Sequence, residues 1–185
     1  MGIISIIIIF ICLCVDNMVS ANMSAMKMTP ENKSVFSIKM GLFFAGFNTL
    51  LFGLGYLLSV CFFRKWVSLA GSWVAFAFLL LLGIKFMLES IEKSPSFSGG
   101  DMEDTRKLIK VSALVAMNSF LVGYAVETTG AACFPAFLLL ALITFVMTLI
   151  GFHIGKSNSK TIVSKRVELV AGVVLIIMAL RLIII

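Results

Sequence analysis

Six long apolar segments dominate this sequence and leave few folds open to it. A helix that crosses the hydrocarbon core of a bilayer needs about 20 mostly apolar residues. Six segments reach that length, at 2–22, 36–62, 67–91, 108–127, 131–154 and 166–185. Hydrophobic residues make up 61% of the chain and charged residues 13%, whereas about a quarter of a soluble domain is charged. The sequence therefore predicts an all-α membrane protein with six transmembrane helices in the lipid bilayer.

Composition and short motifs exclude several functional classes. The net charge of +6 comes from Lys and Arg in short loops between apolar segments, where membrane topology places them, so it does not indicate a nucleic-acid partner. The four cysteines show no CxxC or paired Cys/His spacing, which argues against a zinc site or a disulfide framework. The chain has no Walker-type nucleotide-binding loop. We expect neither an enzyme nor a bound cofactor.

The distribution of basic residues predicts the orientation of the chain. Arg64 and Lys65 lie on one side of the membrane, and eleven basic residues lie on the other. The eleven are Lys27, Lys33, Lys39, Lys93, Arg106, Lys107, Lys110, Lys156, Lys160, Lys165 and Arg166. Because cytoplasmic loops are enriched in Lys and Arg, we expect both termini to lie outside, in a bacterial-type inner or plasma membrane. The first segment carries Asp16 after its apolar run and no basic stretch before it, so we expect a retained helix and not a cleaved signal peptide.

The two halves of the chain resemble each other weakly. With three helices each, residues 1–92 and 108–185 form two predicted repeats of opposite orientation, joined by a cytoplasmic loop at 93–107. A shift of 96 residues places Lys85 over Arg181, so that each third helix ends with a cation at the same position. Inverted repeats of this kind build transporters whose binding site lies near the membrane midplane, at the repeat interface.

The first helices of the two halves carry matching polar residues. A shift of 102 residues places "CVDNMVSA" (14–21) over "AMNSFLVG" (116–123), so that Asp16 meets Asn118 and Asn17 meets Ser119. On the second helices, the repeat places Asn48 opposite Thr144. These polar positions, each surrounded by apolar residues, are the main evidence for the repeat.

Asp16 is the residue that most needs a function. It lies about two-thirds of the way along the first segment, and a charged residue inside a bilayer costs roughly 2.5–3.5 kcal/mol on insertion scales. One carboxylate with several amide and hydroxyl oxygens is a ligand set for a hard cation. The candidate ligands are Asp16, Asn17, Ser20, Asn48, Asn118, Ser119 and Thr144. The alternative for the uncharged members is hydrogen bonding between membrane helices.

Three further charged residues have simpler explanations. Lys85 and Arg181 lie near the ends of apolar segments, so each side chain can extend to the membrane surface. Pairing of Lys85 with Glu89, one helical turn away, is the alternative. Glu127 ends the fourth segment on the outer side, where we expect a solvated helix terminus.

A soft-metal site is a second chemical alternative. At helical spacing, Cys12, Asp16, Ser20 and Met23 share one stripe, and thiolate and thioether ligands favour Cu(I). Against this, methionines commonly fill irregular gaps in packed cores, and others are scattered along the chain. A thiol–disulfide electron carrier would need a second cysteine in the fourth helix, and Cys133 lies beyond it.

With these residues in place, the chain resembles the MntP-type manganese efflux pumps, of the LysE-like exporter group, over nearly its whole length. "CVDNMVSA" keeps the Asp of the family's first helix as Asp16, and "GLFFAGFNTLLFGLGYLLS" (41–59) resembles the second helix. "LLGIKFMLES" (81–90) resembles a family stretch with Gly, a basic residue and Glu. The most specific match is the final segment, "GFHIGKSNSKTIVSKRVELVAGVVLII" (151–177).

The resemblance implies a transporter that exports a divalent cation, Mn²⁺ first, by alternating access, and it leaves a homo-oligomer open. Two positions depart from the family pattern: Asn118 stands in place of an Asp, and Asn48 in place of a Glu. One carboxylate neutralises only half the charge of Mn²⁺. The alternative is therefore a relative that has lost part of the acidic site and either does not transport or takes a soft metal or a small solute.

Overall fold

A computed structural model describes residues 3–27, 33–63, 68–91, 105–128, 133–157 and 161–184, and every residue in these ranges is helical. The α-helices are α1 (Ile3–Lys27), α2 (Lys33–Leu58), α3 (Ser68–Ile91), α4 (Thr105–Thr128), α5 (Cys133–Ser157) and α6 (Thr161–Ile184). A π-helical turn, η2 (Ser59–Phe63), follows α2 directly. The predicted all-α fold and its six helices are confirmed.

The first helix is longer than the sequence pattern predicts. It continues past residue 22 to Lys27, because the polar residues there include no proline or glycine and bond within the helix. The hydroxyl of Ser24 donates to the carbonyl oxygen of Ser20 at 2.7 Å, one turn back, as Ser and Thr do in helices. Asp16 consequently lies near the middle of α1 and not at two-thirds of its length.

The helices are those of a multi-pass membrane protein. α1, α2, α4 and α5 are each long and apolar enough to cross a bilayer. In α3 and α6, the apolar stretches of the described residues are shorter, Trp73–Leu88 and Leu169–Arg181. Large apolar side chains are exposed every four residues along α5, at Phe134, Leu138, Leu142, Val146 and Ile150. This spacing places them on one helix face, which suits contact with lipid.

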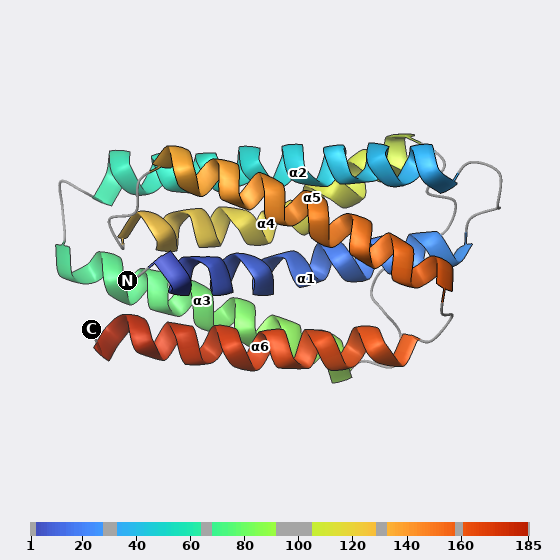
Figure 1. Cartoon of the computed structure of the whole chain (residues 1–185). Coiled ribbons are helices and arrows are strands. Elements are labelled where there is room, and N and C mark those ends of the chain that lie inside the picture. The colour runs from blue at the N-terminus through green and yellow to red at the C-terminus, as the bar shows by residue number, and fades with distance from the viewer. Residues whose placement is uncertain are drawn as a thin grey trace.

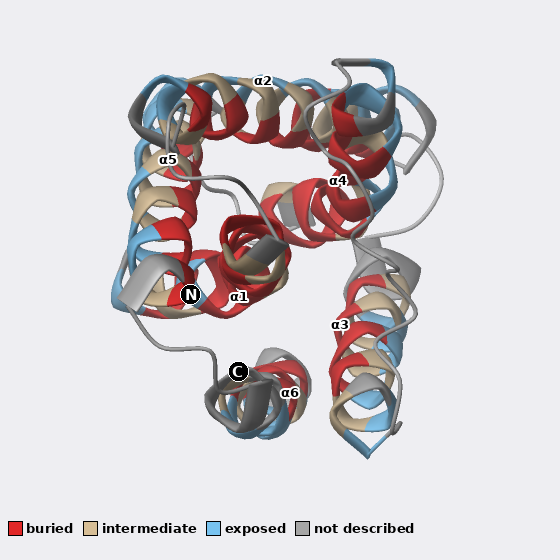
Figure 2. Ribbon diagram, turned by 90° about the vertical axis from the view of Figure 1, so that its right-hand side faces the viewer, coloured by how far each residue is buried: buried red, intermediate tan, exposed pale blue. Residues whose placement is uncertain are grey.

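The six helices form three layers (Figure 1). α1 and α4 lie in the middle, with α2 and α5 on one side and α3 and α6 on the other. Burial follows this order (Figure 2): 72% of the most apolar window of α1 and 61% of that of α4 is buried, against 33% for α2 and 28% for α5. Both termini lie at the same end of the bundle. Polar residues on α1 and α4 are therefore the most shielded from lipid.

The central helices pack on the helices of the other half of the chain. α1 packs along α5, and α4 packs along α2. At both crossings a glycine meets a carbonyl group, Gly151 against Met18 and Gly55 against Phe120. These are matching positions under the shifts of 96 and 102 residues, so the packing is consistent with the predicted inverted repeat. Glycines allow this close approach because they carry no Cβ atom.

We predict that Gly151→Ala destabilises the protein, because the added Cβ would collide with the carbonyl oxygen of Met18. Overpacking of a tight contact costs about 1–3 kcal/mol, and here the obstacle is backbone, which cannot rotate away. Gly46→Ala is the matched control, since Gly46 is exposed on α2 with no atom within 4 Å of its Cβ position. Thermal unfolding in detergent should give a Tm several degrees lower for Gly151→Ala alone. Equal Tm values for the two variants would contradict this packing.

Candidate functional site

A layer of buried polar side chains crosses the bundle at mid-height. Asn48 on α2, Asn118 on α4 and Thr144 on α5 are buried near the middle of their helices, at the level of Asp16 on α1. Apolar clusters close the bundle on both sides of this layer. Toward the end that holds the termini lie Ile6, Phe10, Phe52, Val126, Ala136 and Leu140 of a first cluster, which also continues past the layer to Val19 and Phe86. Toward the other end, it includes Phe36, Met40, Leu108, Val111 and Phe152.

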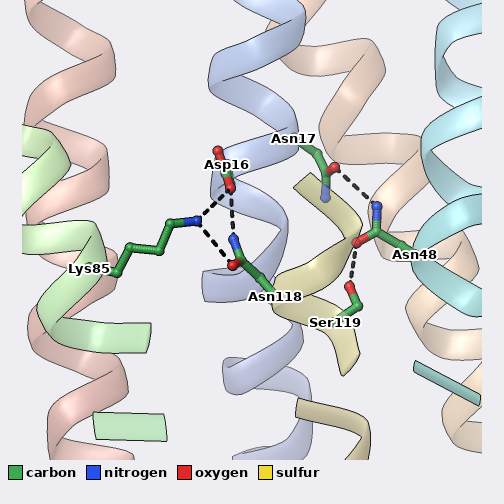
Figure 3. Close-up of polar contacts among 6 residues, drawn as sticks. All are labelled: Asp16, Asn17, Asn48, Lys85, Asn118 and Ser119. Atoms are coloured by element: carbon green, nitrogen blue, oxygen red, sulfur yellow. Dashed lines mark hydrogen bonds and ion pairs between the residues drawn. The ribbon is translucent and has the colours of Figure 1, made fainter. Parts of the chain in front are cut away.

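Asp16, Asn118 and Lys85 form the charged part of the polar layer (Figure 3). The amide Nδ2 of Asn118 donates to Oδ2 of Asp16 at 2.8 Å. The ammonium Nζ of Lys85 donates to Oδ1 of Asn118 at 3.0 Å and lies 3.9 Å from Oδ2 of Asp16. The amide thus joins the carboxylate and the ammonium, and the charge of Asp16 is balanced within the protein.

The position of Lys85 corrects the prediction that it extends to the membrane surface. Figure 3 shows its side chain running from α3 toward α1 and α4. Helical side chains tilt toward the N-terminus of their helix, which for Lys85 is away from the nearer end of α3, at Ile91. This tilt is the signal that could have identified the contact from the sequence. The alternative pairing with Glu89 involves a side chain outside the described residues.

A second network lies on the other side of α1 and α4. Nδ2 of Asn48 donates to Oδ1 of Asn17 at 3.1 Å and to the carbonyl oxygen of Phe44 at 2.8 Å. The hydroxyl of Ser119 donates to Oδ1 of Asn48. All three side chains are buried, so Asn48 joins α2 to both central helices.

The two networks use neighbouring residues on the same two helices. On α1, Asp16 belongs to the first network and Asn17 to the second, and on α4 the same division separates Asn118 from Ser119. Five of the seven predicted ligands, together with Lys85, therefore gather at the interface of α1 and α4. Asp16 and Asn118, which the repeat pairs in sequence, bond to each other, and the paired Asn17 and Ser119 both bond to the side chain of Asn48.

The other two predicted ligands are buried but bond elsewhere. The hydroxyl of Thr144 shares a hydrogen bond of 3.2 Å with the thiol of Cys14, and the hydroxyl of Thr148 donates to the carbonyl oxygen of Thr144 at 2.7 Å. Ser20 is buried on α1, where its carbonyl accepts the bond from Ser24. Thr144 lies in the polar layer and Ser20 one helical turn from Asp16, and neither side chain is bonded directly to a residue of the two networks.

The structure gives little support to a soft-metal site. Within the described ranges, no three His, Cys, Asp or Glu side chains gather. Cys12 is buried in the first apolar cluster, and Met23 packs against the same cluster, which is how a gap-filling methionine behaves. The side chain of Cys133 lies outside the described residues.

Glu127 and Arg181 differ in their surroundings. Glu127, predicted as a solvated helix terminus, is partly exposed near the end of α4, and Ser59 of η2 donates to its Oε2 at 2.7 Å. Arg181 is exposed in the last turn of α6. Lys85 and Arg181 are counterparts in the predicted repeat, but only Lys85 enters the polar layer.

The first network has the chemistry of a cation site that is occupied by an ammonium group. A carboxylate oxygen of Asp16 and the amide oxygen of Asn118 both face Nζ of Lys85. These are hard oxygen ligands of the kind that Mg²⁺, Ca²⁺ and Mn²⁺ prefer. If Lys85 turned away, both oxygens could bind a metal cation, while the second network would keep α1, α2 and α4 in place.

Comparison with known proteins shows the family of this chain. A relative from Clostridium botulinum, named putative manganese efflux pump MntP 2, is 27% identical over 194 residues, covering 98% of this chain and 94% of the relative. Proteins named putative manganese efflux pump MntP from Campylobacter jejuni and Desulfitobacterium hafniense are 26% and 29% identical, covering 78% and 76% of this chain and 76% and 73% of their own lengths. No solved structure matches the chain. The family model described as "Putative manganese efflux pump" matches residues 31–183, and the chain therefore belongs to this Mntp family.

Proposed function

We propose that this protein is a secondary transporter that exports a divalent cation, with Mn²⁺ as the first candidate. The observation that carries the proposal is a carboxylate, Asp16, held with the amide of Asn118 midway between two apolar clusters. Membership of the Mntp family and the names of its relatives support manganese as the cargo. The energetic cost of placing Asp16 in this layer is best explained by a cation that needs it.

In this proposal the two networks have different tasks. Asp16 supplies the negative charge and Asn118 a neutral oxygen, directly at the cation. Asn17, Asn48 and Ser119 set the spacing of the helices, because their hydrogen bonds hold α1, α2 and α4 together. Ser20 lies one turn from Asp16 on α1, and Thr144 bonds to Cys14 on the α5 side of the layer, so both would contact the cation only as it leaves its two main ligands. With one carboxylate, the site suits a cation that keeps part of its hydration shell.

Transport would proceed by alternating access. The polar layer lies between two apolar clusters, so opening one while the other stays closed exposes the cation to one side at a time. We propose that residues 1–92 and 108–185 are the two inverted repeats and move against each other around the layer. The segment between them, 93–107, would be the cytoplasmic connection.

The driving force would be an ion gradient or the membrane potential. An inside-negative potential opposes cation export by about 2.3 kcal/mol per charge for each 100 mV. The total cost is therefore twice as large for a divalent ion. The sequence contains no Walker-type nucleotide-binding loop. Exchange for protons, carried by groups other than the Asp16 and Lys85 pair, would overcome this opposition.

One observation favours a second candidate function. Asp16 already has a cationic partner in Lys85, so its charge is satisfied without any transported ion. A relative that no longer transports, or that takes a different solute, would keep such a pair for stability. The experiment below separates the two candidates.

We predict that Asp16→Asn abolishes Mn²⁺ transport by purified protein in proteoliposomes, because it removes the only charge of the ligand set. Glu127→Gln makes the same chemical change nine residues beyond Asn118, about 14 Å away at 1.5 Å per residue, and should keep most of the transport. A panel of competing divalent and monovalent cations reports specificity. Equal transport by wild type and Asp16→Asn would contradict the first function, and no transport of any cation by wild type would support the second.

We further propose that both termini face outward from an inner or plasma membrane, as the distribution of basic residues indicates. A reporter enzyme that is active only outside the cytoplasm should be active when fused after Ile185, and inactive when inserted between residues 93 and 107. The reverse pattern would contradict the orientation.

A further inference from the structure

We propose that Lys85 is a built-in counter-ion: its ammonium group occupies the cation site while no metal is bound, and the transported cation displaces it. This inference rests on the proposed function. Nζ of Lys85 lies 3.0 Å from Oδ1 of Asn118 and 3.9 Å from Oδ2 of Asp16. These are the two oxygens that we assign to the metal, so Lys85 and the metal compete for the same atoms.

Charge makes the competition strict. Asp16 and Lys85 together are neutral, which suits a site at mid-height in a membrane protein. A divalent cation on Asp16 leaves a charge of +1, and the same cation with Lys85 still beside it leaves +2. Like charges at this separation repel strongly where water is scarce. Binding of the metal must therefore move the ammonium group away, and departure of the metal must bring it back.

The structure gives Lys85 room to leave. Its side chain is 41% exposed, against 17% for Asp16, and α3 lies in an outer layer of the bundle. Lys85 is also only six residues from the end of α3 at Ile91. A lysine has a flexible four-carbon stem and can carry its ammonium group to the membrane surface. The position that the sequence predicts for Lys85 is, in this account, its metal-bound position.

Asn118 is suited to serve both states. Its Nδ2 donates to Asp16 in the metal-free arrangement while its Oδ1 accepts from Lys85. When the ammonium group leaves, Oδ1 becomes available to the metal without a change of side-chain position. An aspartate at 118 would carry a second negative charge and would need more than one lysine for balance. The amide and the single lysine are therefore a matched pair.

The consequence for transport is a neutral return step. After the metal is released, Lys85 neutralises Asp16, so the empty site can change access without moving a net charge through the apolar layer. Without Lys85, the empty carrier would lack the positive charge of the ammonium group beside Asp16, and its return would be slower. Exchange of one metal ion for another does not use the empty carrier and would continue.

The first test compares Lys85→Met with Arg181→Met, which removes the exposed cation at the corresponding position of α6. Equilibrium binding of Mn²⁺ to the purified full-length protein should be about tenfold tighter for Lys85→Met, within the roughly 5–150-fold typical of coupled binding events. In proteoliposomes, its net Mn²⁺ efflux should fall while exchange of Mn²⁺ for Mn²⁺ persists. Arg181→Met should match wild type. Wild-type affinity and efflux in Lys85→Met would overturn the inference.

The second test uses wild-type protein, because Lys85→Met removes the cation beside the partly buried carboxylate of Asp16 and could unfold the protein. Labelling of Lys85 by an amine-reactive reagent, measured by mass spectrometry, should rise several-fold as Mn²⁺ is added. The midpoint of this rise should fall at the Mn²⁺ concentration that half-saturates binding. Asp16→Asn is the control, in which labelling should be high and independent of Mn²⁺. If the labelling of wild type is unchanged at saturating Mn²⁺, the inference about Lys85 is overturned and the proposed manganese function is not. Wild type that neither binds nor transports Mn²⁺ would overturn the proposed manganese function as well.

Discussion

A carboxylate in the middle of a membrane helix has to be balanced by its neighbours, and the arrangement of this bundle follows from that requirement at Asp16. The two most buried helices, α1 and α4, lie against each other where Asp16 meets Asn118. α3 lies where Lys85 can reach both. The cost of an unpaired charge in hydrocarbon, several kcal/mol, is large compared with most single packing contacts. The charged network therefore sets which helices occupy the centre.

Close packing of the helix backbones fixes the positions of the helices that carry this network. Gly55 and Gly151 bring the outer helices α2 and α5 onto the carbonyl groups of α4 and α1. On the other side, a Cβ atom at Gly83 would lie 2.9 Å from the carbonyl oxygen of Gly172, and one at Gly172 would lie 2.8 Å from that of Gly83. This reciprocal contact holds α3 to α6 only two residues from Lys85. Small residues at the crossings thus position the polar side chains between them.

Sequence patterns predicted the helices and most of the polar layer, because both follow from local chemistry. Long apolar segments fold as helices in a bilayer, and an isolated Asp16 or Asn118 within such a segment is conspicuous. The role of Lys85 was missed, since its position near the end of an apolar segment has a simpler explanation, and only the packing of α3 decides between them. Glu127 was missed for the same reason, because its partner Ser59 belongs to a different helix. Contacts between helices depend on the packing angles between them, and these angles cannot be predicted from the sequence of one helix.

The central claim is that Asp16 and Asn118 exchange an ammonium group for a metal cation. The most direct measurement is an experimental structure of the protein with Mn²⁺, in which anomalous scattering locates the metal. We predict an anomalous peak bound to the carboxylate of Asp16 and the amide oxygen of Asn118, with the ammonium group of Lys85 moved toward the membrane surface. A structure in which Lys85 keeps its contacts with Asp16 and Asn118 while Mn²⁺ binds elsewhere would contradict the account.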